Sequence, residues 1–330
     1  MTAAIQTRQL VKHYGDVKAV DGVDLNVERG ELYGFLGPNG AGKTTTISIL
    51  STMLKPTSGE ARVAGLDVLT QSYAVRKRIG IVFQDPSLDE ELTGRENMVF
   101  HARLYKVPRA ERDRRIDDLL AMVDLRDRQN SRVKEYSGGM RRRLELARGL
   151  LHNPEVLFLD EPTLGLDPQT RNHIWDYIRR LNKERGVTMM LTTHYMEEAD
   201  MLCNRIGIID KGRIVAEGTP AELKAQLGGD LVYVEVEGAN GKVPDAIKAL
   251  PFVRSAIATT SGVQLEVQNG ESAIPKILDA VRGSGGVVQS INLKKPTLND
   301  VFVKHTGRQI RDEDMDAPTR MRFFMRHRRR

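Results

Sequence analysis

The sequence predicts an α/β domain with a largely parallel sheet, followed by a small α+β domain of ferredoxin-like order. From Ile5 to about Leu227, β-type runs alternate with segments of helical periodicity, as they do in α/β domains. After a turn at Gly228-Gly229, a second alternation follows the order β-α-β-β-α-β. The length of 330 residues also agrees with two domains rather than one.

We expect the first domain to span residues 1–227, the accessory domain 228–307 and a charged tail 308–330. From about residue 86 to 151 the pattern is mainly helical and charged, for example at Pro108 to Met122, which predicts a helical subdomain inserted into the sheet domain. The elements predicted for the accessory domain are a strand at Leu231 to Glu237, a helix at Val243 to Leu250, a hairpin at Ala256 to Thr260 and Val263 to Gln268, a helix at Ala273 to Arg282 and a strand at Val287 to Leu293.

Three apolar runs of the first domain end at polar or glycine-rich segments. The run Leu32 to Leu36 leads into a glycine-rich turn, and the run Val156 to Leu159 leads into two acids. A third run, Thr188 to Thr192, ends just before His194. Ligands of open α/β sheets gather at the carboxyl ends of the parallel strands, so we expect these three ends to line one site.

Composition excludes several classes of protein. Hydrophobic residues make up 40% of the chain and charged residues 28%, the balance of a globular protein. No apolar run reaches the roughly 18 to 20 residues of a membrane span, and the first residues lack a signal-peptide pattern, so we expect a protein of the cytosol or its membrane face. Cys203 is the only cysteine, which excludes an internal disulfide and a cysteine-rich zinc site; we expect it to be a packing residue.

The net charge of +6 resides in the last eleven residues, which hold six arginines and no acid. The rest of the chain holds 44 basic and 44 acidic residues, and such a neutral body does not favour nucleic acid as a partner. The tail arginines are interleaved with Phe323, Phe324 and two methionines, which suits contact with an anionic membrane surface. The alternative is a solvated tail, or one folded against the acidic stretch Asp312 to Asp316.

A phosphate-binding motif, G-x-x-x-x-G-K-[ST], lies between the first of the three runs and a helix expected to start near Thr45. Its glycines let backbone N–H groups converge on a phosphate, and the helix N-terminus favours negative charge. We expect Lys43 to reach the β- and γ-phosphates and Thr44 to supply a hydroxyl to Mg²⁺. The nucleotide-binding residues predicted from this motif are Gly37, Pro38, Asn39, Gly40, Ala41, Gly42, Lys43, Thr44 and Thr45.

Two adjacent acids, Asp160 and Glu161, follow the second run. Neighbouring carboxylates repel, and a divalent cation is their natural neutraliser. We predict that Asp160 holds Mg²⁺, directly or through water, and that Glu161 polarises the attacking water as a general base. Without the glycine loop, the pair would be interpreted as a solvated acidic turn.

Residues 136–140, Y-S-G-G-M, resemble the LSGGQ signature of the ABC ATPase family, and the resemblance spans about residues 5–223. In that family the signature binds the γ-phosphate of ATP held by the opposite subunit, which implies such contacts for Ser137, Gly138 and Gly139. The same residues expose backbone donors just before a predicted helical run from Met140 to Leu151. The first and last letters depart from the commonest leucine and glutamine, which puts the side-chain contacts of that glutamine in question.

Four further residues match the family one by one, and their roles are implied by the resemblance. Tyr14 sits where the family stacks an aromatic ring on adenine, and Gln84 where a glutamine approaches Mg²⁺ and water. Asp167 resembles the D-loop residue that passes between subunits, and His194 the switch histidine that contacts the γ-phosphate. With the motifs above, the implied catalytic set is Lys43, Gln84, Glu161 and His194, and the implied metal ligands are Thr44, Gln84 and Asp160.

The resemblance implies the ATP-hydrolysing subunit of an ABC exporter, with ATP and Mg²⁺ at its site. The working unit would be a homodimer sharing two ATP sites, bound to a membrane-spanning permease at the cytoplasmic face of the cell membrane. The ending Pro296 to Gly307 resembles ATPases of daunorubicin-resistance-type drug exporters, which implies an accessory domain that helps dimerisation or engages the permease. A passive packing domain is the alternative. The same similarity implies a hydrophobic drug or lipid as cargo, and transport of a polysaccharide, an ion or a nutrient stays open.

Two other functions compete with the exporter. A soluble ABC ATPase of DNA repair or translation would carry long coiled-coil insertions or two cassettes, whereas this chain has one glycine loop, one signature and no extended heptads. A non-catalytic nucleotide-sensing module would not need Lys43, Asp160, Glu161 and His194 together.

Overall fold

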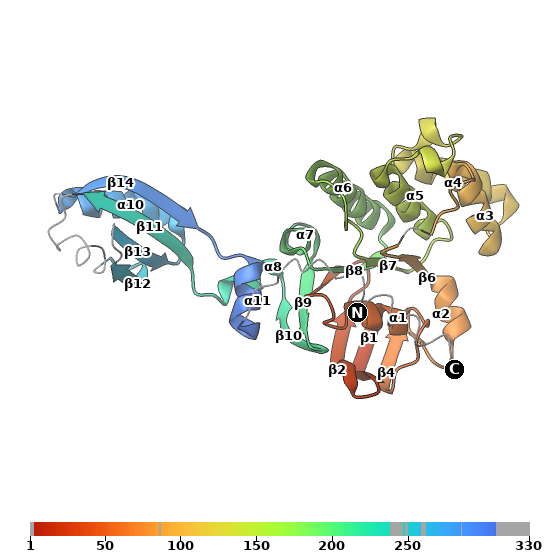
Figure 1. Cartoon of the computed structure of the whole chain (residues 1–330), viewed down its shortest axis with the longest axis horizontal. Coiled ribbons are helices and arrows are strands. Elements are labelled where there is room, and N and C mark those ends of the chain that lie inside the picture. The colour runs from red at the N-terminus through yellow and green to blue at the C-terminus, as the bar shows by residue number, and fades with distance from the viewer. Residues whose placement is uncertain are drawn as a thin grey trace.

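A six-stranded sheet forms the centre of the first domain in the computed structural model, which describes residues 3–85, 87–237, 247, 250–258, 262–284 and 286–307 (Figure 1). In spatial order its strands are β10 (Arg213–Gly218), β9 (Arg205–Asp210), β3 (Leu32–Leu36), β8 (Thr188–Thr193), β7 (Val156–Asp160) and β6 (Ile79–Val82). All neighbours pair in parallel except β10, which is antiparallel to β9. Because β3, β8 and β7 are adjacent, the three predicted strand ends do meet at one edge.

The central strands are apolar because both faces of the sheet are covered. In β7 every residue is buried: Val156 and Phe158 pack into one core, and Leu157 and Leu159 pack into the other. One core lies between the sheet and the helices α5 (Gly138–Leu150), α6 (Pro168–Arg185) and α7 (Met196–Leu202). The other contains α1 (Lys43–Leu50) and a second sheet, with α2 (Ser72–Arg78) at its margin.

That second sheet is antiparallel and was not predicted, so the expectation of a largely parallel sheet holds for only one of the two sheets. Its order is β2 (Val17–Val27), β1 (Ile5–Tyr14), β4 (Ser58–Val63) and β5 (Leu66–Asp67). The pairing of β1 with β2 contains register shifts, one of them across Gln9, whose φ is 45°. Such bulges interrupt the period-2 alternation by which an antiparallel strand is recognised in a sequence.

The helical subdomain consists mainly of helices, as predicted. It contains α3 (Gly94–Leu104), α4 (Arg109–Met122), the short helices η1 (Arg126–Arg128) and η2 (Val133–Glu135), and α5. Pro108 caps α4, so the helix predicted at Pro108 to Met122 is confirmed. α5 starts two residues before the predicted Met140, because the Ser137 side chain accepts a hydrogen bond from the Met140 N–H and caps the helix there.

The described strands and helix of the accessory domain follow the ferredoxin-like order that the sequence predicts. Its antiparallel sheet runs β12 (Val253–Ala258), β13 (Gly262–Val267), β11 (Asp230–Glu237) and β14 (Val287–Lys294), with α10 (Gly270–Gly283) packed against it. The predicted hairpin is present, although β12 begins three residues earlier than expected. Of the predicted helix Val243 to Leu250, only Ile247 and Leu250 are described, Ile247 as helical, and the tail 308–330 lies outside the described residues.

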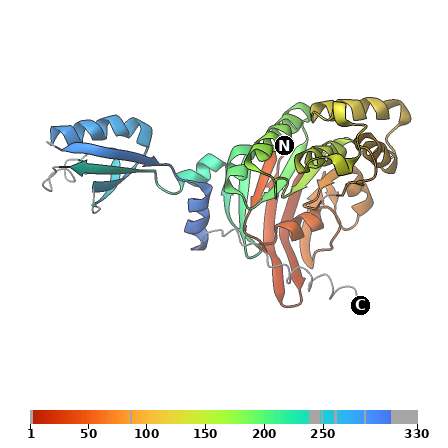
Figure 2. The same ribbon diagram turned by 45° about the horizontal axis from the view of Figure 1, so that its top comes forward.

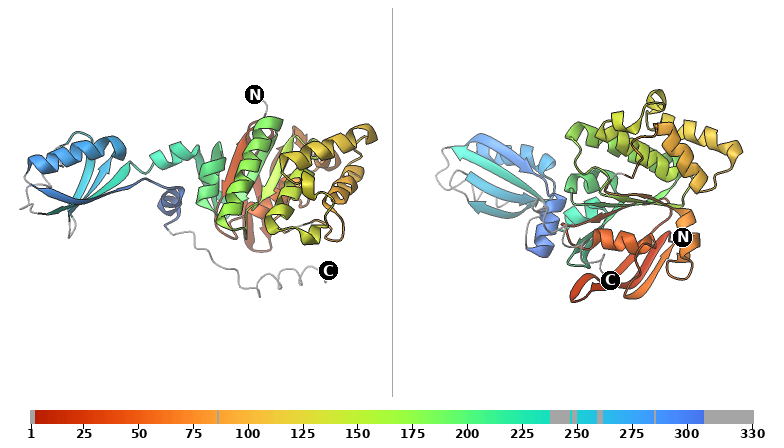
Figure 3. Two further views of the ribbon diagram at one scale, coloured as in Figure 1. Left: turned by 90° about the horizontal axis from the view of Figure 1, so that it is seen from above. Right: turned by 45° about the vertical axis from the view of Figure 1, so that its right-hand side comes forward.

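The chain returns from the accessory sheet to the first domain. After β14, helix α11 (Leu298–Thr306) packs against α7 and α8 (Pro220–Ala225), and it buries Leu298, Val301 and Phe302 in the same core as α7. The accessory sheet itself projects beyond α8 and α11 as a separate lobe (Figures 2 and 3). Within the described residues, no helix combines the length and the apolar character needed to cross a membrane.

An aromatic stack fastens α3 to the end of α5. The His101 and Tyr105 rings lie 4.7 Å apart, and the Tyr105 ring stacks on His152 at 3.9 Å. Burial lowers the pKa of His101 to about 3, with help from the nearby charge of Arg148. His101 is therefore uncharged in the folded protein at neutral pH.

We predict that His101 makes the helical subdomain sensitive to acid. The unfolded chain takes up a proton at His101 near pH 6.5, whereas the folded chain does so only near pH 3, so stability is full above pH 6.5 and falls below it. At pH 5 the expected loss is about 1 to 2 kcal/mol. Urea unfolding at pH 7 and pH 5 should show a smaller loss in His101→Phe. The same substitution at exposed His305 serves as the control, and equal acid sensitivity of His101→Phe and the parent would contradict the assignment.

Candidate functional site

The glycine-rich loop between β3 and α1 has a backbone that only glycine can adopt at two positions. A Cβ atom on Gly37 would lie 2.3 Å from the Ile209 carbonyl oxygen. At Gly42, φ is 108° and a Cβ atom would lie 2.3 Å from the Ala19 carbonyl oxygen. The glycines therefore let the loop pack directly against the backbone of β2 and β9 just before α1, and the N-terminus of α1 follows the loop as it does in phosphate-binding loops.

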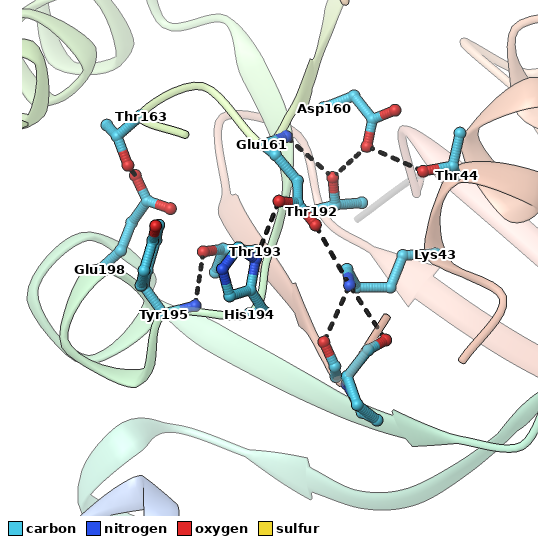
Figure 4. Close-up of polar contacts among 12 residues, drawn as sticks. Lys43, Thr44, Asp160, Glu161, Thr163, Thr192, Thr193, His194, Tyr195 and Glu198 are labelled. Carbon is cyan, nitrogen blue, oxygen red and sulfur yellow. Dashed lines mark hydrogen bonds and ion pairs between the residues drawn. The ribbon is translucent and has the colours of Figure 1, made fainter. Parts of the chain in front are cut away.

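Lys43 is the first residue of α1 and is only 4% exposed. Its Nζ donates to the carbonyl oxygens of Gly37 and Pro38 at 2.8 and 3.2 Å, and it lies 3.3 Å from Glu161 Oε1 (Figure 4). Burial lowers the pKa of Lys43, while Glu161 and Asp160 oppose that shift. The ammonium group is thus held at the mouth of the loop by oxygen atoms that a phosphate can replace.

Asp160 ends β7 and points toward α1 (Figure 4). Its Oδ1 accepts hydrogen bonds from the Thr44 hydroxyl at 3.3 Å and from the Thr192 hydroxyl at 2.5 Å. Burial, reinforced by the charge of Glu161, raises the pKa of Asp160. A hydroxyl and a carboxylate beside a phosphate loop are the hard oxygen donors that Mg²⁺ takes together with substrate phosphates. Thr44 and Asp160 therefore fit that ion.

Glu161 has an unusual backbone, with φ at 46° in the left-handed region. Its N–H donates hydrogen bonds to both the carbonyl oxygen and the hydroxyl oxygen of Thr192, each at 3.1 Å. Its Oε2 lies 2.8 Å from His194 Nδ1, while its Oε1 faces Lys43. Burial works against the charged form, but the hydrogen bond from His194 and the charge of Lys43 outweigh it and lower the pKa of Glu161. Glu161 is thus ionised at neutral pH and able to accept a proton.

The structure brings five of the predicted residues into direct contact. The connected residues are Lys43, Thr44, Asp160, Glu161 and His194. Gln84 follows β6, the neighbour of β7, and so lies at the same edge of the sheet. Tyr14 ends β1, where the Lys12 ammonium lies 5.3 Å from its ring centroid.

The other predicted residues form a second group. Ser137, Gly138 and Gly139 lie at the start of α5, and Asp167 caps α6 by accepting a hydrogen bond from the Thr170 N–H at 2.9 Å. A Cβ atom on Gly139 would lie 2.5 Å from Thr170 Cγ2, so this loop and the start of α6 are in close contact. A single chain therefore presents two groups: the one around Lys43, and a signature group made of Ser137, Gly138, Gly139 and Asp167.

The sequence did not predict the contributions of Thr192 and Glu198. Thr192 was assigned to a strand, yet its hydroxyl holds both Asp160 and the Glu161 N–H. Glu198, on α7, is completely buried and accepts hydrogen bonds from Thr163 and Trp175, which joins α7 to the segment after Glu161. The available signals were a threonine at the end of an apolar run and an acid facing the core of a short helix.

Two family models match the chain. Residues 20–164 match the family model described as ABC transporter. Residues 218–306 match the family model described as ATP-binding protein DrrA1-3-like, C-terminal domain. The accessory lobe and α11 fall within the second match.

Two curated relatives match almost the whole chain. The daunorubicin resistance ATP-binding protein DrrA3 of Streptomyces coeruleorubidus is 46% identical over 297 residues, which cover 90% of this chain and 93% of the relative. The daunorubicin/doxorubicin resistance ATP-binding protein DrrA of Streptomyces peucetius is 41% identical over 325 residues, covering 96% of both chains.

Solved structures match the first domain. The structure of cbiO1 from Clostridium perfringens, part of the ABC transporter complex cbiONQ, has a TM-score of 0.65 and 30% identity, and the match covers 69% of this chain and 92% of that chain. The ATP-binding cassette MJ0796, a dimer in a post-hydrolysis state bound to ADP and Pi, has a TM-score of 0.58 and 30% identity, with coverage of 65% and 98%.

We predict that the Thr192 hydroxyl stabilises the folded state. Thr192→Val keeps the shape but removes the buried donor to Asp160, so the free energy of unfolding should fall by about 1 to 3 kcal/mol. Thr192→Ser retains the hydroxyl and should recover most of that loss. Chemical denaturation of the three proteins measures the effect. Equal stability of Thr192→Val and the parent would show that the hydrogen bonds to Thr192 contribute nothing net.

Proposed function

The chain belongs to the ABC transporter family and is a transporter ATPase that hydrolyses ATP, and from this membership we propose that it drives the export of a hydrophobic drug or lipid through a separate membrane subunit. The observation that carries the proposal is the contact network of Lys43, Glu161 and His194 beside Asp160 and Thr44. This network supports the ATP hydrolysis in the proposal, because it offers a cation suited to phosphate, a carboxylate suited to accept a proton from water and oxygen ligands suited to a metal.

Within this site each side chain has a distinct task. Lys43 exchanges its carbonyl and carboxylate partners for the phosphates of ATP, which frees Glu161 Oε1. Glu161 accepts a proton from the water that attacks the γ-phosphate, and His194 holds the other carboxylate oxygen in place. Mg²⁺, held by Thr44 and Asp160 with Gln84 nearby, would neutralise phosphate charge. The products are ADP and inorganic phosphate.

A complete site requires two copies of the chain. The signature group of one copy and the phosphate loop of the other would enclose each ATP, so the two ATP molecules would join a homodimer. The dimeric, ADP- and Pi-bound relative reported above supports this arrangement. Because γ-phosphate contacts both halves, hydrolysis and phosphate loss remove the attraction and the dimer reopens.

The helical subdomain offers a surface for a membrane-spanning permease. On α3, Phe100 and Leu104 are 64% and 65% exposed and lie one turn apart. Exposed apolar side chains of this size mark contact surfaces when they cluster. We place the permease there, with the ATPase peripheral at the cytoplasmic face of the cell membrane. Contact of the tail with anionic lipid stays a prediction.

The cargo is inferred from relatives. Both curated relatives described above are named for daunorubicin resistance, and their similarity extends through the accessory domain. This supports a drug or lipid exporter over a soluble ATPase of DNA repair or translation. For the accessory domain we propose a contribution to dimerisation or to the permease contact.

Glu161→Gln should abolish turnover while ATP binding survives. The amide keeps the shape but cannot accept the proton, so kcat should fall by at least about 10²-fold. ATP should then accumulate in a closed dimer. Phosphate release measures turnover, and size-exclusion chromatography with light scattering measures the dimer. If the variant hydrolysed ATP at the parental rate, Glu161 would not be the general base.

Mixing two inactive variants tests the shared site. Ser137→Arg retains an intact Lys43, and Lys43→Met retains an intact Ser137, so a mixed dimer contains one complete site only if the sites are composite. Random mixing should then restore about a quarter of parental turnover, since half of the dimers are mixed and each has one good site. Absence of recovery, with mixed dimers demonstrated by differential tags, would argue for sites within single copies.

A further inference from the structure

One buried guanidinium group, that of Arg142 on α5, contacts two loops of the active site. Arg142 is 7% exposed, and its ion-pair partner Glu145 is 2% exposed, at 2.9 Å. Every nitrogen of the guanidinium group donates to a backbone carbonyl oxygen. Nε donates to Pro162 at 2.6 Å, Nη1 to Phe83 at 2.6 Å, and Nη2 to both Asp160 and Glu161 at 3.2 Å.

Three of these four carbonyls belong to consecutive residues, 160 to 162. The segment contains Glu161, whose φ of 46° lies in the left-handed region, a conformation that persists in a residue other than glycine only where its surroundings enforce it. The Thr192 contacts hold the N–H side of Glu161, and Arg142 holds the carbonyl side. The fourth carbonyl, that of Phe83, directly precedes Gln84.

We propose that Arg142 is a positioning residue for the hydrolytic reaction, which holds the backbone of residues 160 to 162 so that the Glu161 carboxylate faces Lys43 and His194. This inference rests on the proposed role of Glu161 as the base. The planar guanidinium matches several carbonyls at once, whereas an ammonium group at the same position has only three donors and a shorter reach. The charge of Arg142 is balanced by Glu145, so its binding to the carbonyls does not leave an unpaired buried cation.

The same residue connects the signature group to the base of its own chain. Arg142 lies five residues after Ser137, which caps the first turn of α5. In the proposed dimer, Ser137 serves the ATP bound by the partner, whereas Glu161 serves the ATP bound by its own chain. A shift of α5 on binding the partner's ATP would therefore act on Glu161 through Arg142.

Arg142→Lys tests the proposal, because lysine keeps the charge that balances Glu145 but cannot hold the four carbonyls together. We expect kcat to fall at least tenfold, since small misplacement of a reacting group costs that much or more, while ATP affinity changes by less than about twofold. Affinity is measured with a fluorescent ATP analogue, and kcat is expressed per folded molecule. Arg141→Lys, the same change at the adjacent and more exposed position, should retain parental kcat.

A second variant covers the case in which Arg142→Lys folds poorly. Arg142→Met combined with Glu145→Gln removes both buried charges, and replacing a buried ion pair by uncharged groups is often tolerated. It should show the same low kcat with near-parental ATP affinity. Parental kcat per folded molecule in both variants, with only a lower melting temperature, would reduce Arg142 to a structural role and overturn the proposal.

A double-mutant comparison separates this inference from the proposed function. In the Glu161→Gln background, Arg142→Lys should reduce residual turnover by less than about twofold, because the group that it positions is already gone. A further tenfold loss there would show that Arg142 does not act through Glu161. Parental hydrolysis by Glu161→Gln itself would instead contradict the proposed function, whatever Arg142 does.

Discussion

Two adjacent buried carboxylates are the constraint on which the rest of the site depends. Asp160 and Glu161 both lie in the interior, where an unpaired negative charge is costly. The surroundings treat them differently: burial raises the pKa of Asp160, whereas His194 and Lys43 outweigh burial and lower the pKa of Glu161. A bound cation would therefore stabilise the charged form of Asp160, whereas Glu161 is already stabilised as a carboxylate by Lys43 and His194.

Residues from four parts of the chain hold these two carboxylates in place. The phosphate loop supplies Lys43 and Thr44, β7 supplies the acids, β8 supplies Thr192, and α5 supplies Arg142. The carboxylates of Asp160 and Glu161 each accept from side chains of other elements, and their carbonyl oxygens accept from Arg142. Residues 160 and 161 are therefore tied at once to α1, β8 and α5.

The sequence predicted those parts of the site whose chemistry resides in short motifs. Lys43, Thr44, Asp160, Glu161 and His194 were found because glycine spacing, an acid pair and strand ends are local signals. Thr192 and Arg142 act through contacts between segments far apart in the chain, and neither differs locally from an ordinary strand threonine or helix arginine. The antiparallel sheet was missed for a related reason, because bulges in β1 hide its alternation.

The return of the chain through α11 bears on where the first domain ends. A boundary near residue 227 follows from the turn at Gly228, and it stays a prediction. Leu298, Val301 and Phe302 nevertheless belong to the same core as α7, and Lys304 donates a hydrogen bond to the Gln226 carbonyl, so the exit and return of the chain lie together. The accessory sheet is thus inserted between two helices of the first core. Since α7 begins two residues after His194, α11 anchors the lobe beside the segment that follows His194.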